Sequence, residues 1–148
     1  MGTINFAFGS NLDLAQMRER CPASKPLGTA VLRGWRFRIT RHGYATVVPE
    51  AGAAVHGLLW DLTAQDEAKL DAYEGTAEGL YSKIQLAAEL PTGGSVNAMV
   101  YTMNDAEPGD PMPGYLEDVI AAAKGHHFPP AYLEELGRWR TEADLASD

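Results

Sequence analysis

The sequence predicts an α+β fold that forms a single domain over residues 1–148. Strand-like segments follow one another through short turns, which is typical of antiparallel hairpins. Helical segments lie between them at irregular intervals, and this argues against the strict alternation of a doubly wound sheet. The chain has 148 residues, 45% of them hydrophobic, with no internal repeat or linker that would divide it. One hydrophobic core is therefore expected.

The first two elements are a strand and a short helix. Large apolar residues alternate at the start of the chain, at Ile4, Phe6 and Phe8. The strand pattern breaks at Gly9, and a helical pattern begins at once, with apolar residues at Leu14, Met17 and Cys21. Ser10 and Asp13 have capping-box spacing, so we expect the Ser10 hydroxyl to cap this helix. Pro22 ends it, because proline cannot donate the N–H that a helix interior needs.

The middle of the chain is rich in strands. Strand-like segments are predicted over residues 28–32, 35–40, 44–48 and 55–62. Turns are expected at Arg33-Gly34 and at His42-Gly43. The segment 55–62 is apolar on both faces, as a central strand should be. A short helix then runs from Ala64 to Tyr73 or Glu74, with Thr63 as its cap and Gly75 as its stop.

The C-terminal part begins with a hairpin and ends with helices. The segments 80–90 and 95–103 flank Pro91-Thr92-Gly93-Gly94, which is a clear turn signal. Residues 104–114 contain three prolines and are predicted to form an irregular loop, which we expect to build one end of a binding pocket. Two amphipathic helices follow, over about 115–124 and 130–140. The acidic tail after Thr141 is predicted to fray.

Charge argues against a nucleic-acid partner. The formal net charge is −8, which repels phosphate backbones unless a local basic patch overcomes it. The best candidate for such a patch includes Arg36 and Arg38. In a strand, these two share a face opposite Trp35 and Phe37, so they are expected to lie on a solvated outer surface.

The cysteine count and the hydropathy pattern favour the cytoplasm. Cys21 is the one cysteine, which excludes an intramolecular disulfide and is typical of a reducing compartment. No apolar run is long enough to cross a membrane, and the N-terminus lacks the features of a signal peptide. The sequence leaves the oligomeric state open, a homodimer being one option.

The sequence argues against a metal site and against a catalytic cysteine or serine nucleophile. The four histidines are scattered, whereas a zinc site needs three or four converging ligands, so no metal is expected. Cys21 shares a helix face with Met17 and is better interpreted as a small buried hydrophobe. Ser10 is not in a Gly-x-Ser-x-Gly elbow, and its surroundings match neither a phosphate-binding loop nor a dinucleotide fingerprint.

Two features could form a site together. A strand that breaks sharply into a helix leaves backbone N–H groups without partners, so the turn after Phe8 could hold a carboxylate or an oxyanion. Glu74 projects from the same side of its helix as Leu70, beside the apolar stripe that Leu70 and Tyr73 are expected to bury. Partial burial would raise its pKa towards that of a general base. The alternative is an exposed glutamate at a helix end. Tyr81 and Tyr115 could contact a ligand or serve in packing.

Several motifs together resemble the gamma-glutamylcyclotransferase family, of the AIG2-like kind. The opening motif, an aromatic residue followed by Gly-Ser-Asn-Leu, matches Phe8-Gly9-Ser10-Asn11-Leu12. The second, Leu-Asp-x-x-Glu-Gly, matches Leu70–Gly75. A following tyrosine matches Tyr81, and a late Pro-x-Tyr motif matches Tyr115. The resemblance spans nearly the whole chain, and motifs in the same order are far more specific than any single one.

The resemblance implies a small mixed or antiparallel β-barrel with flanking helices and no cofactor. It implies that the α-amine of a γ-glutamyl group attacks its own γ-carbonyl, giving 5-oxoproline and a released amino acid or amine. Glu74 would be the general acid/base, the turn from Phe8 to Leu12 would bind substrate through backbone N–H groups, and Tyr81 and Tyr115 would line the pocket.

Two alternatives to a general cyclotransferase stay open. One is a relative specialised for γ-glutamyl amines or for a γ-glutamyl biosynthetic intermediate. The other is a non-catalytic binding protein, against which the presence of Glu74 argues. The chain also departs from the family at Phe8, where tyrosine is usual, so a contact from that hydroxyl is absent and substrate preference can differ.

Overall fold

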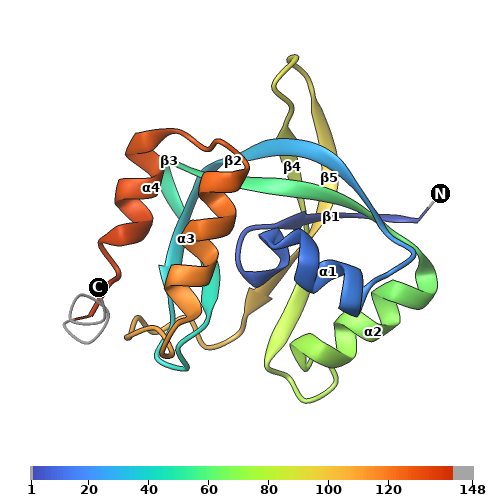
Figure 1. Cartoon of the computed structure of the whole chain (residues 1–148), viewed down its shortest axis with the longest axis horizontal. Coiled ribbons are helices and arrows are strands. Elements are labelled where there is room, and N and C mark those ends of the chain that lie inside the picture. The colour runs from blue at the N-terminus through green and yellow to red at the C-terminus, as the bar shows by residue number, and fades with distance from the viewer. Residues whose placement is uncertain (1, 142–148) are drawn as a thin grey trace.

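A computed structural model shows a closed barrel of five strands with helices packed around it, and it describes residues 2–141 (Figure 1). The strands neighbour one another in the order β1-β3-β2-β4-β5. All neighbouring pairs are antiparallel except β1 and β5, which close the barrel in parallel at Asn5 and Met99. The α+β class and the mixed barrel with flanking helices are confirmed. The predicted fraying after Thr141 lies outside the described residues.

Strand β1 (Thr3–Ala7) is short, but its neighbours are long. Strand β2 (Lys25–Ile39) continues through Gly34, where we predicted a turn between two strands. That prediction is wrong, because the chain at Gly34 forms a bulge and not a reversal. Gly34 has a φ of 85°, and pairing with β3 resumes beyond it at Trp35. A glycine inside a strand accommodates the left-handed backbone of a bulge without strain.

Strand β3 (Ala45–Leu62) is likewise one strand where two were predicted. Arg33 pairs with Ala54 and Trp35 pairs with Pro49, so the residues between these partners on β3 bulge outward. The C-terminal half of β3 pairs with β1 on one side and β2 on the other. This confirms the prediction of a central strand over 55–62, apolar on both faces.

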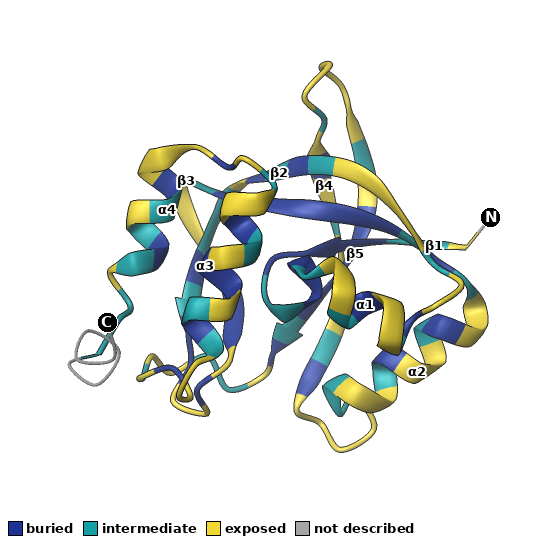
Figure 2. Ribbon diagram, in the orientation of Figure 1, coloured by how far each residue is buried: buried dark blue, intermediate teal, exposed yellow. Residues whose placement is uncertain are grey.

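Strands β4 (Tyr81–Glu89) and β5 (Ser95–Met103) form the predicted hairpin. Its tip projects from the barrel at the top of Figure 1 and is exposed in Figure 2. At the other end of the hairpin, the first residue of β4 and the last of β5 are buried. Tyr81 and Met103 pair there, next to the end of α2.

Helix α1 (Leu14–Arg20) follows a single 3-10 turn, η1 (Ser10–Leu12). The Asp13 side chain caps α1 by accepting from the N–H groups of Ala15 and Gln16. The predicted cap by the Ser10 hydroxyl is therefore wrong, because the 3-10 turn separates Ser10 from the helix. Leu14 is 39% exposed, so it too lies off the buried face.

Helix α2 (Ala64–Glu74) begins and ends where the sequence predicts. Thr63 accepts from the N–H of Asp66 at 3.1 Å, and Gly75 adopts the left-handed conformation that ends the helix. Leu70 is fully buried as expected. Tyr73 is 55% exposed, so the prediction that it shares a buried stripe with Leu70 is wrong.

Helices α3 (Tyr115–Gly125) and α4 (Pro130–Gly137) pack together against the opposite side of the barrel from α1 and α2 (Figure 1). The segment before α3 is irregular, as predicted, and lies against the end of β2, where Thr40 and Pro108 form a bridge and the Gly109 N–H donates to the Ile39 carbonyl at 3.0 Å. The core lies between the strands and the inner faces of the helices, where the ribbon is dark in Figure 2. Within residues 2–141, no helix is both long and apolar enough to cross a membrane.

Candidate active site

A pocket of about 460 Å³ opens where β1 ends. Its walls come from β1 and the turn after it, from α1 and α2, from the lower ends of β4 and β5, and from the start of α3. Of the residues that the sequence singled out, seven line it: Phe8, Gly9, Ser10, Asn11, Glu74, Tyr81 and Tyr115. Segments separated by more than a hundred positions in the chain therefore meet at one site.

Glu74 lies at the C-terminal end of α2, partly buried in the wall of this pocket. Asn11 Nδ2 donates to Glu74 Oε1 at 3.4 Å, which joins the helix end to the turn. Burial raises the pKa of Glu74 to about 7, and this effect outweighs the opposing influences of the Asn11 hydrogen bond and of Arg20. A carboxyl group with this pKa can both accept and donate a proton near neutral pH.

The turn after β1 is held by hydrogen bonds from three directions. Trp60 Nε1 donates to the Asn11 carbonyl at 3.1 Å, and His126 Nε2 lies 2.7 Å from the Leu12 carbonyl. The N–H groups of Leu12 and Asp13 close the 3-10 turn onto the carbonyls of Gly9 and Ser10. Leu12 is 1% exposed and lies in the core, not in the pocket. The N–H groups of Leu12 and Asp13 are therefore already engaged within the turn.

Arg20 is the third group at this turn, and the sequence analysis missed it. Its Nη1 donates to Asn11 Oδ1 at 2.8 Å and to Ser10 Oγ at 3.1 Å. Its Nη2 donates to the Tyr73 hydroxyl at 2.6 Å, and the guanidinium lies 3.8 Å from the centre of that ring. Because Arg20 occupies Asn11 Oδ1, the amide NH₂ of Asn11 is left to face Glu74. An arginine in the last turn of a helix is ordinary, so the sequence carried no signal for this role.

Tyr81 and Tyr115 meet at Ala45 on the far wall. The Tyr81 hydroxyl donates to the Ala45 carbonyl at 3.0 Å, and the Tyr115 hydroxyl oxygen accepts from the Ala45 N–H at 3.2 Å. Burial raises the pKa of both phenols, so both are neutral at physiological pH. A side chain at Gly9 would lie 2.8 Å from the Tyr115 oxygen, which explains why glycine is needed there.

Two lining residues carry buried oxygens without a partner among the described residues. Asn5 Oδ1 and Gln16 Oε1 accept no hydrogen bond, although Asn5 Nδ2 donates to the Met99 carbonyl at 3.1 Å. Such acceptors are costly unless something donates to them. Neither residue was singled out from the sequence.

The loop over 104–114, which we expected to shape the pocket, contributes none of the lining residues described.

The remaining candidates lie away from the pocket. Within residues 2–141, no three or more histidine, cysteine or carboxylate side chains gather as metal ligands would. Cys21 is buried against Asp66, and burial raises the pKa of its thiol to about 11, which agrees with a structural role. Arg36 pairs with Glu50 and Arg38 with the Ala106 carbonyl, so they form the solvated outer surface that was predicted.

Comparison with protein families gives a match to the gamma-glutamyl cyclotransferase, AIG2-like family over residues 5–118. The chain belongs to this family. The match includes the turn after β1, Glu74 and Tyr115, so the pocket falls within the part that defines the family.

Individual proteins that are similar to this chain carry the same family name. The gamma-glutamylcyclotransferase of Homo sapiens is 28% identical over 90% of this chain and 76% of its own length. That of Bos taurus is 27% identical with the same coverage. A solved gamma-glutamyl cyclotransferase structure superposes with a TM-score of 0.87 at 24% identity, over 95% of this chain and 89% of the other. At that identity, the structural likeness establishes the fold.

Proposed function

We propose that the pocket cyclises γ-glutamyl compounds. The α-amine nitrogen of the γ-glutamyl group attacks its own γ-carbonyl carbon, and the amide bond to the leaving group breaks. The products are 5-oxoproline and a free amino acid or amine, and no water is consumed. Because the attack is intramolecular, the main task of the protein is to hold a folded substrate conformer in place.

Glu74 is the proposed acid and base. An ammonium nitrogen has no lone pair with which to attack, so a base must first remove its proton. The ionised Glu74 carboxylate takes one proton from the ammonium and returns it to the departing nitrogen. The attacking nitrogen gives up a second proton as the lactam forms, so the amine departs as an ammonium and one hydrogen stays on the ring nitrogen. A pKa of about 7 suits both steps, because neither protonation state is strongly favoured.

The turn after β1 is proposed to hold the reacting carbonyl. Backbone N–H groups between Phe8 and Asn11 would donate to the oxyanion as it develops, an effect that contributes roughly 3 kcal/mol in other acyl-transfer sites. The unpartnered oxygens of Asn5 and Gln16 suit a ligand that brings N–H donors, as an α-amine does. Tyr81 and Tyr115 would shape the wall that the glutamyl chain folds against.

One observation carries this proposal: the half-buried Glu74 carboxylate is hydrogen bonded to Asn11 of the turn inside one pocket. A carboxyl group whose pKa lies near 7 suits proton transfer at neutral pH. A structural role would not require that group to face a cavity.

Replacing Glu74 with glutamine tests the proposal. The protein is incubated with γ-glutamyl dipeptides and γ-glutamyl amines, and 5-oxoproline is measured by mass spectrometry. We expect E74Q to lower the turnover number about 10²–10⁴-fold, the usual contribution of positioned proton transfer. E74Q should be at least as stable as the parent protein at pH 8, because it removes a buried negative charge.

The matched control is E78Q, which neutralises an exposed glutamate just beyond α2. E78Q should retain full activity. An E74Q protein that retained full activity would refute the role of Glu74. Binding of a γ-glutamyl compound with no turnover by the parent protein would favour the non-catalytic alternative, and turnover of amines alone would favour the specialised one.

We also propose a cellular compartment and an oligomeric state for the protein. We place the protein in the cytoplasm because its single cysteine, Cys21, is a buried free thiol. A homodimer stays a prediction, which light scattering on the purified protein would test.

A further inference from the structure

The outer end of the pocket is lined by apolar side chains that residues 2–141 leave partly exposed. Six large hydrophobic side chains are exposed in this part of the chain, and three of them line the pocket: Tyr44, Tyr73 and Leu80. They are 39%, 55% and 38% exposed. Single hydrophobic residues are ordinary on a protein surface, whereas a group of them around one opening marks a place where an apolar ligand binds.

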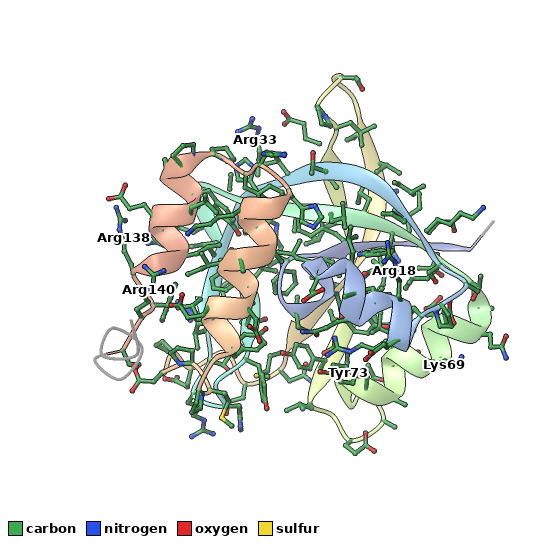
Figure 3. The ribbon with its side chains drawn as sticks, viewed as in Figure 1. Arg18, Arg33, Lys69, Tyr73, Arg138 and Arg140 are labelled. Atoms are coloured by element: carbon green, nitrogen blue, oxygen red, sulfur yellow. The ribbon has the colours of Figure 1, made fainter. Side chains whose placement is uncertain are left out.

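These three side chains, which we call the apolar rim, come from separate segments, and each is held in place. Tyr44 lies between β2 and β3, and its ring meets the Tyr115 ring edge-on, with 5.3 Å between the centres. Tyr73, in the last turn of α2, stacks 3.8 Å from the Arg20 guanidinium and lies below α1 in Figure 3. Leu80 precedes β4, and its N–H donates at 3.0 Å to the carbonyl of the glycine that ends α2. A rim fixed in this way loses little freedom when a ligand covers it.

A fourth exposed hydrophobic side chain extends the rim beside Tyr44. Met112 is 45% exposed, and its N–H donates at 3.1 Å to the carbonyl of Gly43, the residue before Tyr44. It belongs to the loop over 104–114, which lies outside the pocket lining but next to it. Four of the six exposed large hydrophobic residues therefore lie at or beside one opening.

The γ-glutamyl group is the wrong ligand for the apolar rim. Its reacting atoms must reach Glu74, and its ammonium and carboxylate need polar partners such as the buried Asn5 and Asn11 of the pocket wall. Between these groups it carries two methylenes and no large apolar part. The leaving group is the remaining part of the substrate, so it alone can cover the rim.

We propose that the apolar rim binds the side chain of the leaving group, so that the site prefers γ-glutamyl compounds whose leaving amino acid or amine carries a large apolar side chain. This inference rests on the function proposed above and narrows the substrate class that the sequence left open. Tyr44, Tyr73 and Leu80 are then specificity-determining residues.

Two substrates matched in charge test the inference. γ-Glutamyl-leucine and γ-glutamyl-glycine differ only in an apolar side chain, so the charged residues that line the pocket meet the same charges in both. We expect kcat/KM of the parent protein to be about tenfold higher for the leucine compound, because covering part of a leucine side chain has an effect of that size. L80A and Y44A should each lower this ratio about threefold, since part of the covering surface is lost. The ratio compares two substrates on one protein, so a variant that folds less well does not change it.

The control is L27A, which shortens an exposed leucine on β2 that does not line the pocket. L27A should keep the ratio of the parent protein. Equal kcat/KM values for the two substrates in the parent protein, or an unchanged ratio in both L80A and Y44A, would overturn the inference and leave the cyclisation intact. Release of 5-oxoproline from neither substrate would instead refute the proposed function, and this inference with it.

Discussion

At the scale of single residues, the behaviour of Glu74 follows from its surroundings. Desolvation in the pocket wall favours the neutral acid, while Asn11 and Arg20 favour the carboxylate, and the sum brings the pKa to about 7. Had Glu74 been an exposed residue at a helix end, its pKa would have stayed near 4.5. The two interpretations of Glu74 therefore predict different pH profiles.

We expect kcat/KM to rise about tenfold per pH unit on the acid side and to level off near pH 7, where Glu74 becomes ionised. At higher pH kcat/KM should fall again as the substrate ammonium loses its proton, because no proton is then left for the departing nitrogen. In N11A the acid limb should move to higher pH, because the lost hydrogen bond had stabilised the carboxylate. An acid limb near pH 4.5 in the parent protein would contradict the raised pKa of Glu74.

The Glu74 motif and the Phe8–Leu12 turn could be predicted from sequence because each lies in a contiguous stretch with its own start and stop signals. Arg20 and the Asn5 oxygen could not, because their roles depend on contacts with Tyr73 and with Met99, which lie far away in the chain. The exposure of Tyr73 could not be predicted either, because other residues of α2 make its contacts with the barrel: Leu70 is buried, and Asp71 accepts from the Tyr101 hydroxyl at 2.6 Å.

At the scale of elements, helix α2 serves as the support for the base. Its start is tied to the loop after α1, where the buried Asp66 carboxylate accepts from the Ala23 N–H at 2.9 Å and from Ser24 Oγ at 2.8 Å. Its end is fixed by Gly75, whose left-handed conformation (φ 70°) places Glu74 as the last helical residue. The position of the carboxylate therefore depends on the glycine beside it.

Replacing Gly75 with alanine should destabilise the protein by about 1–2 kcal/mol, the cost of a left-handed conformation in a residue with a Cβ. The new Cβ would also lie 3.3 Å from the Leu80 Cβ, so the end of α2 must shift. We expect kcat/KM to fall as well. Urea denaturation and steady-state kinetics measure the two effects.

Gly79 supplies the control, because its φ is also positive (77°) and nothing lies within 4 Å of a Cβ built there. G79A should lose similar stability and keep its activity. Equal kcat/KM values for the two variants would argue against a role for the end of α2 in placing Glu74.

The lengths of strands β2 and β3 were harder to predict than the bounds of helix α2. Gly34 and the residues after Pro49 carry turn signals in the sequence, but pairing between β2 and β3 continues on either side of them. A bulge and a turn both use a glycine with positive φ, so only the partner strand distinguishes them.

At the scale of the whole molecule, the barrel brings the parts of the site together. Strand β1 pairs with both β3 and β5, so the turn that follows β1 emerges beside the buried ends of β4 and β5. Helices α1 and α2 flank this end, and α3 supplies Tyr115 from the opposite side (Figure 1). The order of elements predicted an α+β fold, whereas closure into a barrel came from the family resemblance, because pairings between distant strands leave no local signal.

The central claim is that the γ-carbonyl is attacked by the substrate's own amine and not by water. Running the reaction with γ-glutamyl-alanine in H₂¹⁸O tests it most directly, since only hydrolysis transfers solvent oxygen to the glutamyl product. Mass spectrometry should find 5-oxoproline without the label. Labelled glutamate as the product would contradict the claim and make the protein a hydrolase.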